Sequence, residues 1–256
     1  MGEAWQLAEL TREEIGKLAP TSTLVLPLGA TEQHGGHLPV SVDTLLCEHI
    51  AAAATRLAAA NAGPFLVASP LPYGRSDHHL AFPGTLSLRS ATLLAVLADL
   101  LRSMSAWGVR AVFALNGHGG NDAPLRVALA DAADALPLTV GGASYWTIAW
   151  EALAAEDAAP LGAVPGHAGA LETSLVLAVR PEVVRGEGHV GGAPTPAAED
   201  PAARVVHTTH GAWAAGSGTS DDASTADAAL GTRLLERIER DVARALVDFH
   251  RRAHGA

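Results

Sequence analysis

Apolar and polar positions along the chain form blocks that predict short strands alternating with helices. Four apolar runs, each bounded by turn-forming residues, are typical of buried strands and cover residues 22–29, 64–70, 109–116 and 136–145. A capping box at Thr11 and Glu14 predicts a short helix at 11–18. Longer helices are predicted in segments rich in alanine and leucine, at 43–61, 90–107 and from the end of the third strand to 135. Strands that alternate with helices of this length imply right-handed crossovers. The pattern therefore predicts an α/β fold around a mainly parallel sheet.

The second half of the chain is less regular. Residues 170–179 are apolar and fit either a strand or a helix; we expect a helix that ends at Arg180. Residues 185–223 are rich in Gly, Pro, Ala and Asp and predict a long irregular stretch. Residues 224–254 predict an amphipathic helix with an apolar stripe. Because no repeat or linker is evident, we expect one domain over residues 1–256.

Composition excludes several classes of function. The 48% of hydrophobic residues is ample for a core, and the net charge of −10 argues against nucleic-acid binding. Cys47 is the only cysteine, so no internal disulfide can form and a reducing compartment is expected. The first fourteen residues show no signal-peptide pattern, and no apolar run reaches the roughly 18 residues of a membrane span. We expect a cytoplasmic protein with no membrane partner.

Histidines and acids gather where the predicted strands end. The first strand runs into Glu32 and His34, and Asp43 follows at the start of a helix; the third strand runs into His118. The second strand runs into His78 and His79, which could support the ligands or contact the substrate; half of the 12 histidines fall in these loops and in the later segment that contains His167. Ligands of open parallel sheets bind beyond the carboxyl ends of the strands. Imidazole and carboxylate groups meeting at that edge are typical ligands of zinc, manganese or iron.

Each of these residues also has a simpler interpretation. A single histidine or glutamate is usually a solvated surface side chain, and Asp43 could serve only as a helix N-cap. The joint pattern favours metal binding instead. Glu32, Asp43 and Glu172 brought together would carry three negative charges at short range, which two divalent cations would balance with one positive charge to spare. A single zinc ion would leave one acid in surplus.

Four motifs together resemble those of the creatininase family of metal-dependent amidohydrolases. They are "LPLGATEQHGGHLPVSVDT" (26–44), "FPGTLSL" (82–88), "NGHGGN" (116–121) and "GHAGALETS" (166–174). The resemblance implies a three-layer α/β/α sandwich, commonly assembled as a homohexamer. It also implies two divalent metal ions per chain (Zn, Mn or Fe) and hydrolysis of a C–N bond in a small cyclic amide or related amide.

The resemblance also assigns roles to residues of this chain. Glu32, His34, Asp43 and His118 match metal-ligand positions, with Asp43 bridging the two ions. His167 matches the catalytic histidine, which is expected to pass a proton to the leaving nitrogen. Trp146 matches a tryptophan that covers the substrate in creatininase.

Two departures from creatininase itself bear on ligands and substrate. Gly120 stands where creatininase has a ligand glutamate, and Glu172 is our candidate to replace it. Ala163 stands where a second pocket tryptophan is expected, which argues against creatinine as the substrate. Within the family, a formamide deformylase and a mycofactocin-type peptidase therefore remain open. From another class, a non-catalytic metal-binding module remains open.

Overall fold

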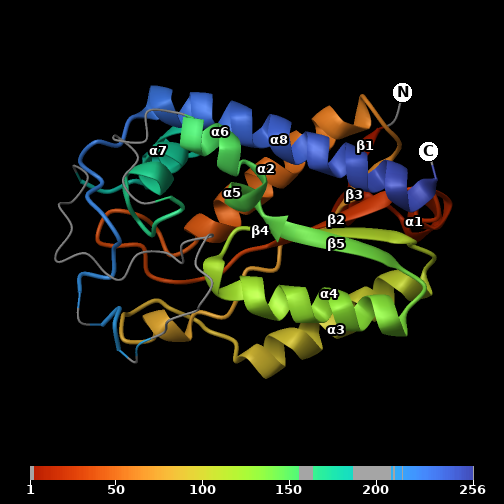
Figure 1. Cartoon of the computed structure of the whole chain (residues 1–256), viewed down its shortest axis with the longest axis horizontal. Coiled ribbons are helices and arrows are strands. Elements are labelled where there is room, and N and C mark those ends of the chain that lie inside the picture. The colour runs from red at the N-terminus through yellow and green to blue at the C-terminus, as the bar shows by residue number, and fades with distance from the viewer. Residues whose placement is uncertain (1–2, 156–163, 187–208, 210, 215, 256) are drawn as a thin grey trace.

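The sheet has five strands, all parallel, in the order β1-β3-β2-β4-β5 (Figure 1). The strands are β1 (Ala4–Gln6), β2 (Thr23–Leu28), β3 (Phe65–Val67), β4 (Ala111–Asn116) and β5 (Thr139–Ser144). This computed structural model describes residues 3–155, 164–186, 209, 211–214 and 216–255. The predicted α/β class and the parallel sheet are confirmed. The three-residue edge strand β1, which pairs with β3, was not predicted.

Helices cover both faces of the sheet (Figure 1). The main helices are α1 (Arg12–Leu18), α2 (Val42–Ala59), α3 (Ser90–Ala106), α4 (Asp122–Ala135), α7 (Ala170–Val179) and α8 (Ala228–His254). Two short helices follow β5, namely α5 (Tyr145–Ile148) and α6 (Trp150–Ala155). On one side of the sheet lie α2, α7 and α8, and on the other lie α3 and α4.

The alternating side chains of the strands divide the core between these layers. In β2, Leu24 and Leu26 are buried among α3 and α4, while Val25 between them is buried among α2, α7 and α8. Successive side chains of a strand point to opposite faces, so a strand buried on both sides reads as a continuous apolar run. The three-layer arrangement follows directly from that pattern.

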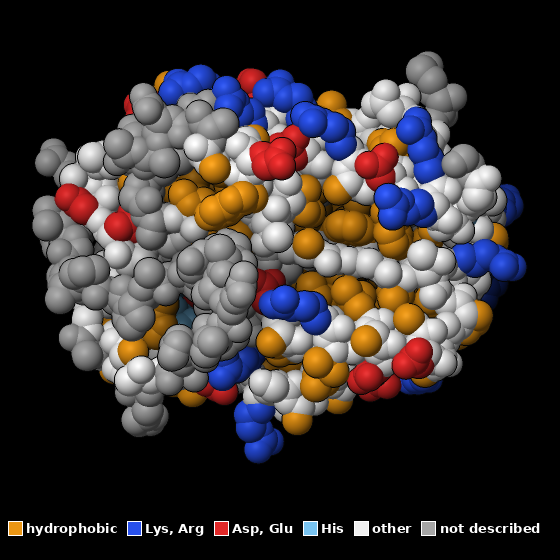
Figure 2. All heavy atoms as spheres, in the orientation of Figure 1, with side chains coloured by type: hydrophobic (Ala, Val, Ile, Leu, Met, Phe, Trp, Pro, Cys, Tyr) orange, Lys and Arg blue, Asp and Glu red, His pale blue; other side chains and the backbone are white. Residues whose placement is uncertain are grey.

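Capping residues explain where the helices begin and end. Thr11 and Glu14 form the expected capping box at α1. The last helix begins a few residues later than predicted because the Asp227 side chain accepts a hydrogen bond from the Leu230 backbone N–H at 2.7 Å. Residues 170–179 are a helix, as expected. Arginine and acidic side chains line the outer face of α8 (Figure 2), as its amphipathic pattern predicts.

The strand order places a topological switch point between β2 and β4. From β2 the chain moves to β3 on one side, then returns to β4 on the other. The loops that leave β2 and β4 therefore diverge at the carboxyl ends of the strands, where ligands bind in this class of sheet. That end lies away from both chain termini (Figure 1). Within the described residues, no helix is both long and apolar enough to cross a membrane.

Candidate metal centre

Five buried side chains meet beyond the carboxyl ends of β2 and β4. Glu32 and His34 follow β2, Asp43 lies in the first turn of α2, His118 follows β4, and Glu172 lies in the first turn of α7. Each of the five is at most 6% exposed. The structure thus brings together all five residues that the sequence predicts as metal ligands.

Asp43 connects two groups of potential ligands. Its Oδ1 lies 3.1 Å from His34 Nε2, and its Oδ2 lies 3.1 Å from His118 Nδ1. Glu172 Oε2 adds a third ligand beside His34, at 3.8 Å from the same Nε2. Glu32 Oε1 lies 3.3 Å from His118 Nδ1 on the other side. The carboxylate of Asp43 is therefore positioned between two sets of donors.

Asp43 does not cap its helix. The N-cap of α2 is Ser41, no side chain makes a capping hydrogen bond there, and Asp43 is already helical. The N-cap interpretation of Asp43 does not hold, because its side chain turns toward the imidazoles.

Hydrogen bonds to the main chain orient both imidazoles of the centre. His34 Nδ1 donates to the Glu32 carbonyl at 3.1 Å, and His118 Nε2 donates to the Arg75 carbonyl at 2.9 Å. The opposite nitrogens face the acids, where each could bind a metal ion once it is deprotonated. Metal-binding histidines in proteins are oriented in this way.

Buried opposite charges shift the pKa values of the centre. Burial alone would lower the pKa of His34, but the carboxylates of Asp43 and Glu172 outweigh it and raise that pKa to about 10. Burial would also lower the pKa of His118, but the carboxylates of Glu32 and Asp43 outweigh it and raise that pKa well above its usual value. Burial raises the pKa of Glu172 to about 7 despite the nearby His34. Without metal, protonated imidazoles balance the acids.

The unpaired oxygens of the centre fit divalent cations. Glu32 Oε2 and Asp43 Oδ2 are buried and have no hydrogen-bond partner. Buried carboxylate oxygens normally have such partners, so these two oxygens are suited to binding a cation. Ligand atoms of His34, Asp43 and Glu172 lie within 4.8 Å of one another, and so do those of Glu32, His78 and His118. Nitrogen and oxygen donors of this kind suit zinc, manganese or iron.

Gly120 could not carry the glutamate that creatininase has at this position. A Cβ atom added there would lie 2.0 Å from the Arg75 carbonyl oxygen and 2.5 Å from His118 Nε2. The backbone around His118 therefore excludes a side chain at residue 120. Glu172 approaches the centre from α7 instead.

His167 lies beside the centre with a defined orientation. Its Nε2 donates to the Gln33 carbonyl at 2.8 Å, and its Nδ1 lies 3.5 Å from Glu32 Oε1. Its backbone N–H donates to Ser220 Oγ at 2.7 Å, which connects it to the chain ahead of α8. Burial, and next the neighbouring His34, lower the pKa of His167 well below its usual value. A neutral imidazole with a lone pair facing the acids is suited to accepting a proton.

The two tryptophans of interest lie in different surroundings. Trp146 is 8% exposed and packs edge-on against Tyr145 within the core that includes α2 and α8. Trp213 lies over the imidazoles of the centre, with ring centroids 4.6 Å from His79 and 5.3 Å from His167. Trp213 was not predicted as part of the site, whereas the buried His79 was expected only to support the ligands or to contact the substrate. The only signal for Trp213 was an isolated aromatic residue in an otherwise irregular stretch.

Two features noted in the sequence have no described structure. Ala163, and residues 187–208 of the stretch 185–223, lie outside the described residues.

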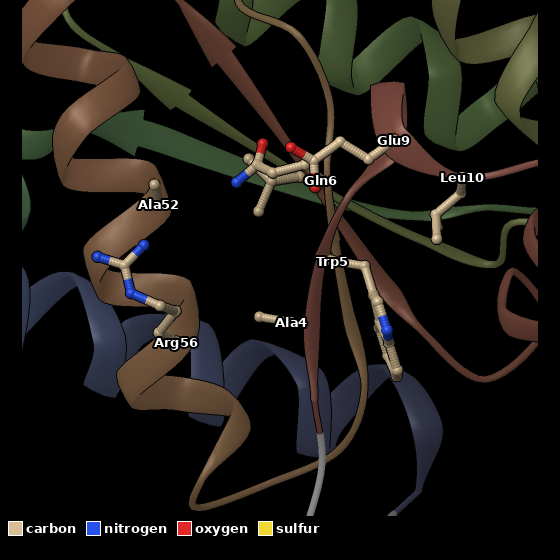
Figure 3. A pocket seen from close by; sticks show the side chains of 8 residues that line it. Ala4, Trp5, Gln6, Glu9, Leu10, Ala52 and Arg56 are labelled. Carbon is tan, nitrogen blue, oxygen red and sulfur yellow. The ribbon is translucent and has the colours of Figure 1, made fainter.

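A separate pocket of about 240 Å³ lies between β1 and α2, with Trp5, Glu9 and Arg56 in its lining (Figure 3). It contains none of the residues of the metal centre.

Comparisons with known proteins identify the family of this chain. A family model described as "Creatininase: Creatinine amidohydrolase" matches residues 8–246. A mycofactocin precursor peptide peptidase of Mycobacterium ulcerans (strain Agy99) is 34% identical over 92% of this chain and 89% of its own length. A creatinine amidohydrolase of Pseudomonas putida is 32% identical over 72% of this chain and 75% of its own length.

Solved structures give the same result. A structure described as "Creatininase Mn" is 30% identical and has a TM-score of 0.70, covering 95% of this chain and 97% of that one. A structure of a mutant creatininase of the Zn-Zn type is 28% identical and has a TM-score of 0.69, covering 95% of this chain and 97% of that one. The family model spans nearly the whole chain, and the motifs that carry the resemblance meet at one centre. The chain therefore belongs to the creatininase family and is a hydrolase of amide C–N bonds.

Proposed function

We propose that this amidohydrolase uses two divalent metal ions per chain, held by two groups of ligands that share Asp43. His34, Asp43 and Glu172 form one group, and Glu32, Asp43 and His118 form the other. The observation that carries the proposal is the position of Asp43, whose two carboxylate oxygens lie 3.1 Å from different imidazoles. Solved relatives described as Mn and Zn-Zn forms support divalent metals of this kind.

The residues around the metals divide the remaining work of hydrolysis. Divalent ions supply a Lewis acid for the amide carbonyl and lower the pKa of water to about 7. His167 then accepts the proton of the attacking water on Nδ1 and delivers it to the leaving nitrogen. Proton transfer by a positioned side chain contributes roughly 10²–10⁴-fold in rate. Gln33 and Ser220 keep the imidazole in place through Nε2 and the backbone N–H.

The substrate is a small amide in our main proposal, and a peptide is the second candidate. One observation favours a peptide: the mycofactocin peptidase matches 92% of this chain at 34% identity, whereas the creatinine amidohydrolase matches 72% at 32%. For Trp146 we retain the role of a substrate contact as a proposal only. We also propose a cytoplasmic homo-oligomer, a hexamer by family resemblance, which light scattering of the purified protein would test.

Metal content tests the ligand assignment. We expect wild-type protein reconstituted with zinc or manganese to bind two equivalents per chain by elemental analysis. Glu32→Gln and His118→Ala should each bind less and lose hydrolytic activity, because each removes a ligand from the same group. His49→Ala is the control, since His49 pairs with Glu239 on the outer surface of α2 and α8. Two full equivalents and full activity in both ligand variants would contradict the assignment.

A substrate panel tests the activity itself. The reconstituted enzyme is incubated with small lactams, formamides and short peptides, and released amines are quantified. We expect hydrolysis that is abolished by a chelator and restored by added metal, with little change in secondary structure. A purely structural metal site would instead lose the fold when the metal is removed.

A further inference from the structure

Four buried imidazoles surround the metal centre, and three of them share one arrangement. His34, His118 and His167 each donate one ring N–H to a backbone carbonyl, those of Glu32, Arg75 and Gln33 respectively. In each case the other ring nitrogen faces an acid of the centre. These three rings therefore turn toward the centre the nitrogen that, once deprotonated, can bind a metal ion or accept a proton.

The fourth imidazole, His79, has the opposite arrangement because of Gln33. The Gln33 side-chain amide is oriented by two backbone groups: its Nε2 donates to the Gly218 carbonyl at 2.6 Å, and its Oε1 accepts from the Gly35 N–H at 2.9 Å. A carbonyl can only accept and an N–H can only donate, so the amide cannot be reversed. His79 Nδ1 lies 3.0 Å from Gln33 Nε2 and must accept its second hydrogen. The proton of neutral His79 is therefore on Nε2.

A second contact of Gln33 does not alter this assignment. Gln33 Nε2 also lies 3.0 Å from His167 Nε2, but the Gln33 backbone carbonyl is closer to that nitrogen, at 2.8 Å. Both hydrogens of the amide already have acceptors in the Gly218 carbonyl and His79. His167 Nε2 therefore remains a donor to the carbonyl.

The Nε2–H of His79 is a buried donor without an acceptor. His79 has no exposed surface, and its Nε2 has no hydrogen-bond partner. Glu32 Oε1 lies 3.7 Å away, beyond hydrogen-bond distance. The ring cannot easily turn aside, because it is stacked on His167 with centroids 4.2 Å apart and covered by the edge-on Trp213. A buried donor left without an acceptor in this way is rare in folded proteins.

We propose that His79 donates a hydrogen bond from Nε2 to the oxygen of the amide being hydrolysed, and that Gln33 is the positioning residue that keeps the proton on that nitrogen. This inference rests on the proposed hydrolytic function and adds a substrate contact to it. Negative charge develops on the amide oxygen during attack by water. A donor already fixed beside the centre stabilises that charge more than it stabilises the bound substrate, so its effect falls on kcat.

Substitutions at His79 separate donation from packing. His79→Gln keeps an N–H near the place of Nε2, whereas His79→Asn removes it. With the substrate that the wild-type enzyme hydrolyses best in the panel, we expect His79→Asn to lower kcat about 100-fold with little change in KM, the scale of losing one preorganised donor. His79→Gln should recover most of that loss. His49→Asn is the matched control, and all variants should bind as much zinc as the wild type.

The position of the proton is read directly by NMR of the zinc-loaded protein labelled with ¹⁵N at histidine. We expect His79 to carry its proton on Nε2 in the wild type. Gln33→Glu replaces the donating nitrogen with an oxygen, so His79 should move its proton to Nδ1 and kcat should fall. In the His79→Gln background, Gln33→Glu should lower kcat by a much smaller factor, because that variant has no imidazole proton at residue 79 to displace.

The outcomes of the two measurements are distinct. A wild-type His79 protonated on Nδ1 would overturn the inference even in a fully active enzyme. So would His79→Asn with kcat within about twofold of the wild type and unchanged metal content. A wild-type enzyme that hydrolyses nothing in the panel would reject the proposed function, while the NMR result would still decide the position of the proton.

Discussion

Asp43 divides its two carboxylate oxygens between His34 and His118, whereas Glu172 approaches His34 alone. These contacts predict different metal contents for two similar substitutions. Glu172→Gln should leave about one ion per chain, because only the His34 group loses a ligand. Asp43→Asn should weaken the binding of both ions. Each affinity should fall by more than the roughly 10–100-fold that is typical of losing a residue that only supports a ligand. Titration of bound zinc against a competing chelator measures both affinities.

Asp99→Asn serves as the control for this comparison, because Asp99 is exposed on α3 and pairs with the exposed Arg102. Equal loss of metal in the Asp43 and Glu172 variants would argue against a bridging role for Asp43.

A different result is expected for substitution of His167, because His167 lies beside the ligands and its Nδ1 faces Glu32. His167→Ala should retain two metal ions and lose roughly 10²–10⁴-fold in kcat, because only proton transfer is removed. Steady-state kinetics together with elemental analysis check this. Loss of metal or of folded protein would assign His167 a structural role instead.

Single residues also show where prediction from sequence stops. Glu32, His34 and His118 were predictable because each directly follows a recognisable apolar strand. Glu172 was predictable from charge balance and from motif resemblance, since nothing in its spacing relates it to β2. Trp213 was missed because it comes from an irregular segment, and His79 was predicted only as a residue that supports the ligands or contacts the substrate. Their positions depend on long-range contacts such as that of Gln33 with Gly218.

At the scale of whole elements, continuous apolar runs identified β2 and β4 well because both are buried on both faces. The strand β1 was missed because three residues are too few to show a pattern, and only its pairing with β3 defines it. The predicted strand 64–70 is shorter in the structure, Phe65–Val67, because the chain leaves the sheet before the pattern ends. Local sequence thus predicts the central elements better than the edge of the sheet.

The contact between α7 and α8 depends on a glycine. A Cβ atom at Gly231 would lie 1.9 Å from the Ser174 carbonyl oxygen, so the two helices could not approach as they do. Gly231→Ala should therefore destabilise the protein by about 1–3 kcal/mol, the usual cost of overpacking. Because α7 also carries Glu172, the variant should bind metal more weakly. Urea unfolding and zinc titration measure the two effects.

Gly16→Ala is the matched control for this prediction. Gly16 lies in α1 with nothing within 4 Å of the added methyl group, so alanine there should stabilise by about 0.5–1 kcal/mol. If both substitutions stabilised the protein, the close contact between α7 and α8 would not be the reason for a glycine at 231.

At the scale of the whole molecule, the metal centre lies at one end of the core rather than within it. Two apolar clusters fill the space on either side of the sheet, while the centre lies beyond the strand ends. Removal of metal should therefore leave the fold intact and change how its stability depends on pH. Without metal, the pKa of His34 is raised to about 10, so the folded state keeps a proton that the unfolded chain loses near pH 6.5.

Stability of the metal-free protein must then fall as pH rises from about 6.5 toward 10. Glu172, with a pKa raised to about 7, acts in the same direction at lower pH. We expect the Tm of chelator-treated protein to be about 10 °C lower at pH 9.5 than at pH 6.5. The zinc-loaded protein should show much less of this loss, because His34 then gives its lone pair to the metal and holds no extra proton. The raised pKa of Cys47 also favours unfolding at high pH. Because it affects the metal-free and the zinc-loaded protein equally, it does not change the difference between their Tm values. Parallel Tm curves for the two forms would mean that protonated imidazoles do not replace the metals in the empty centre.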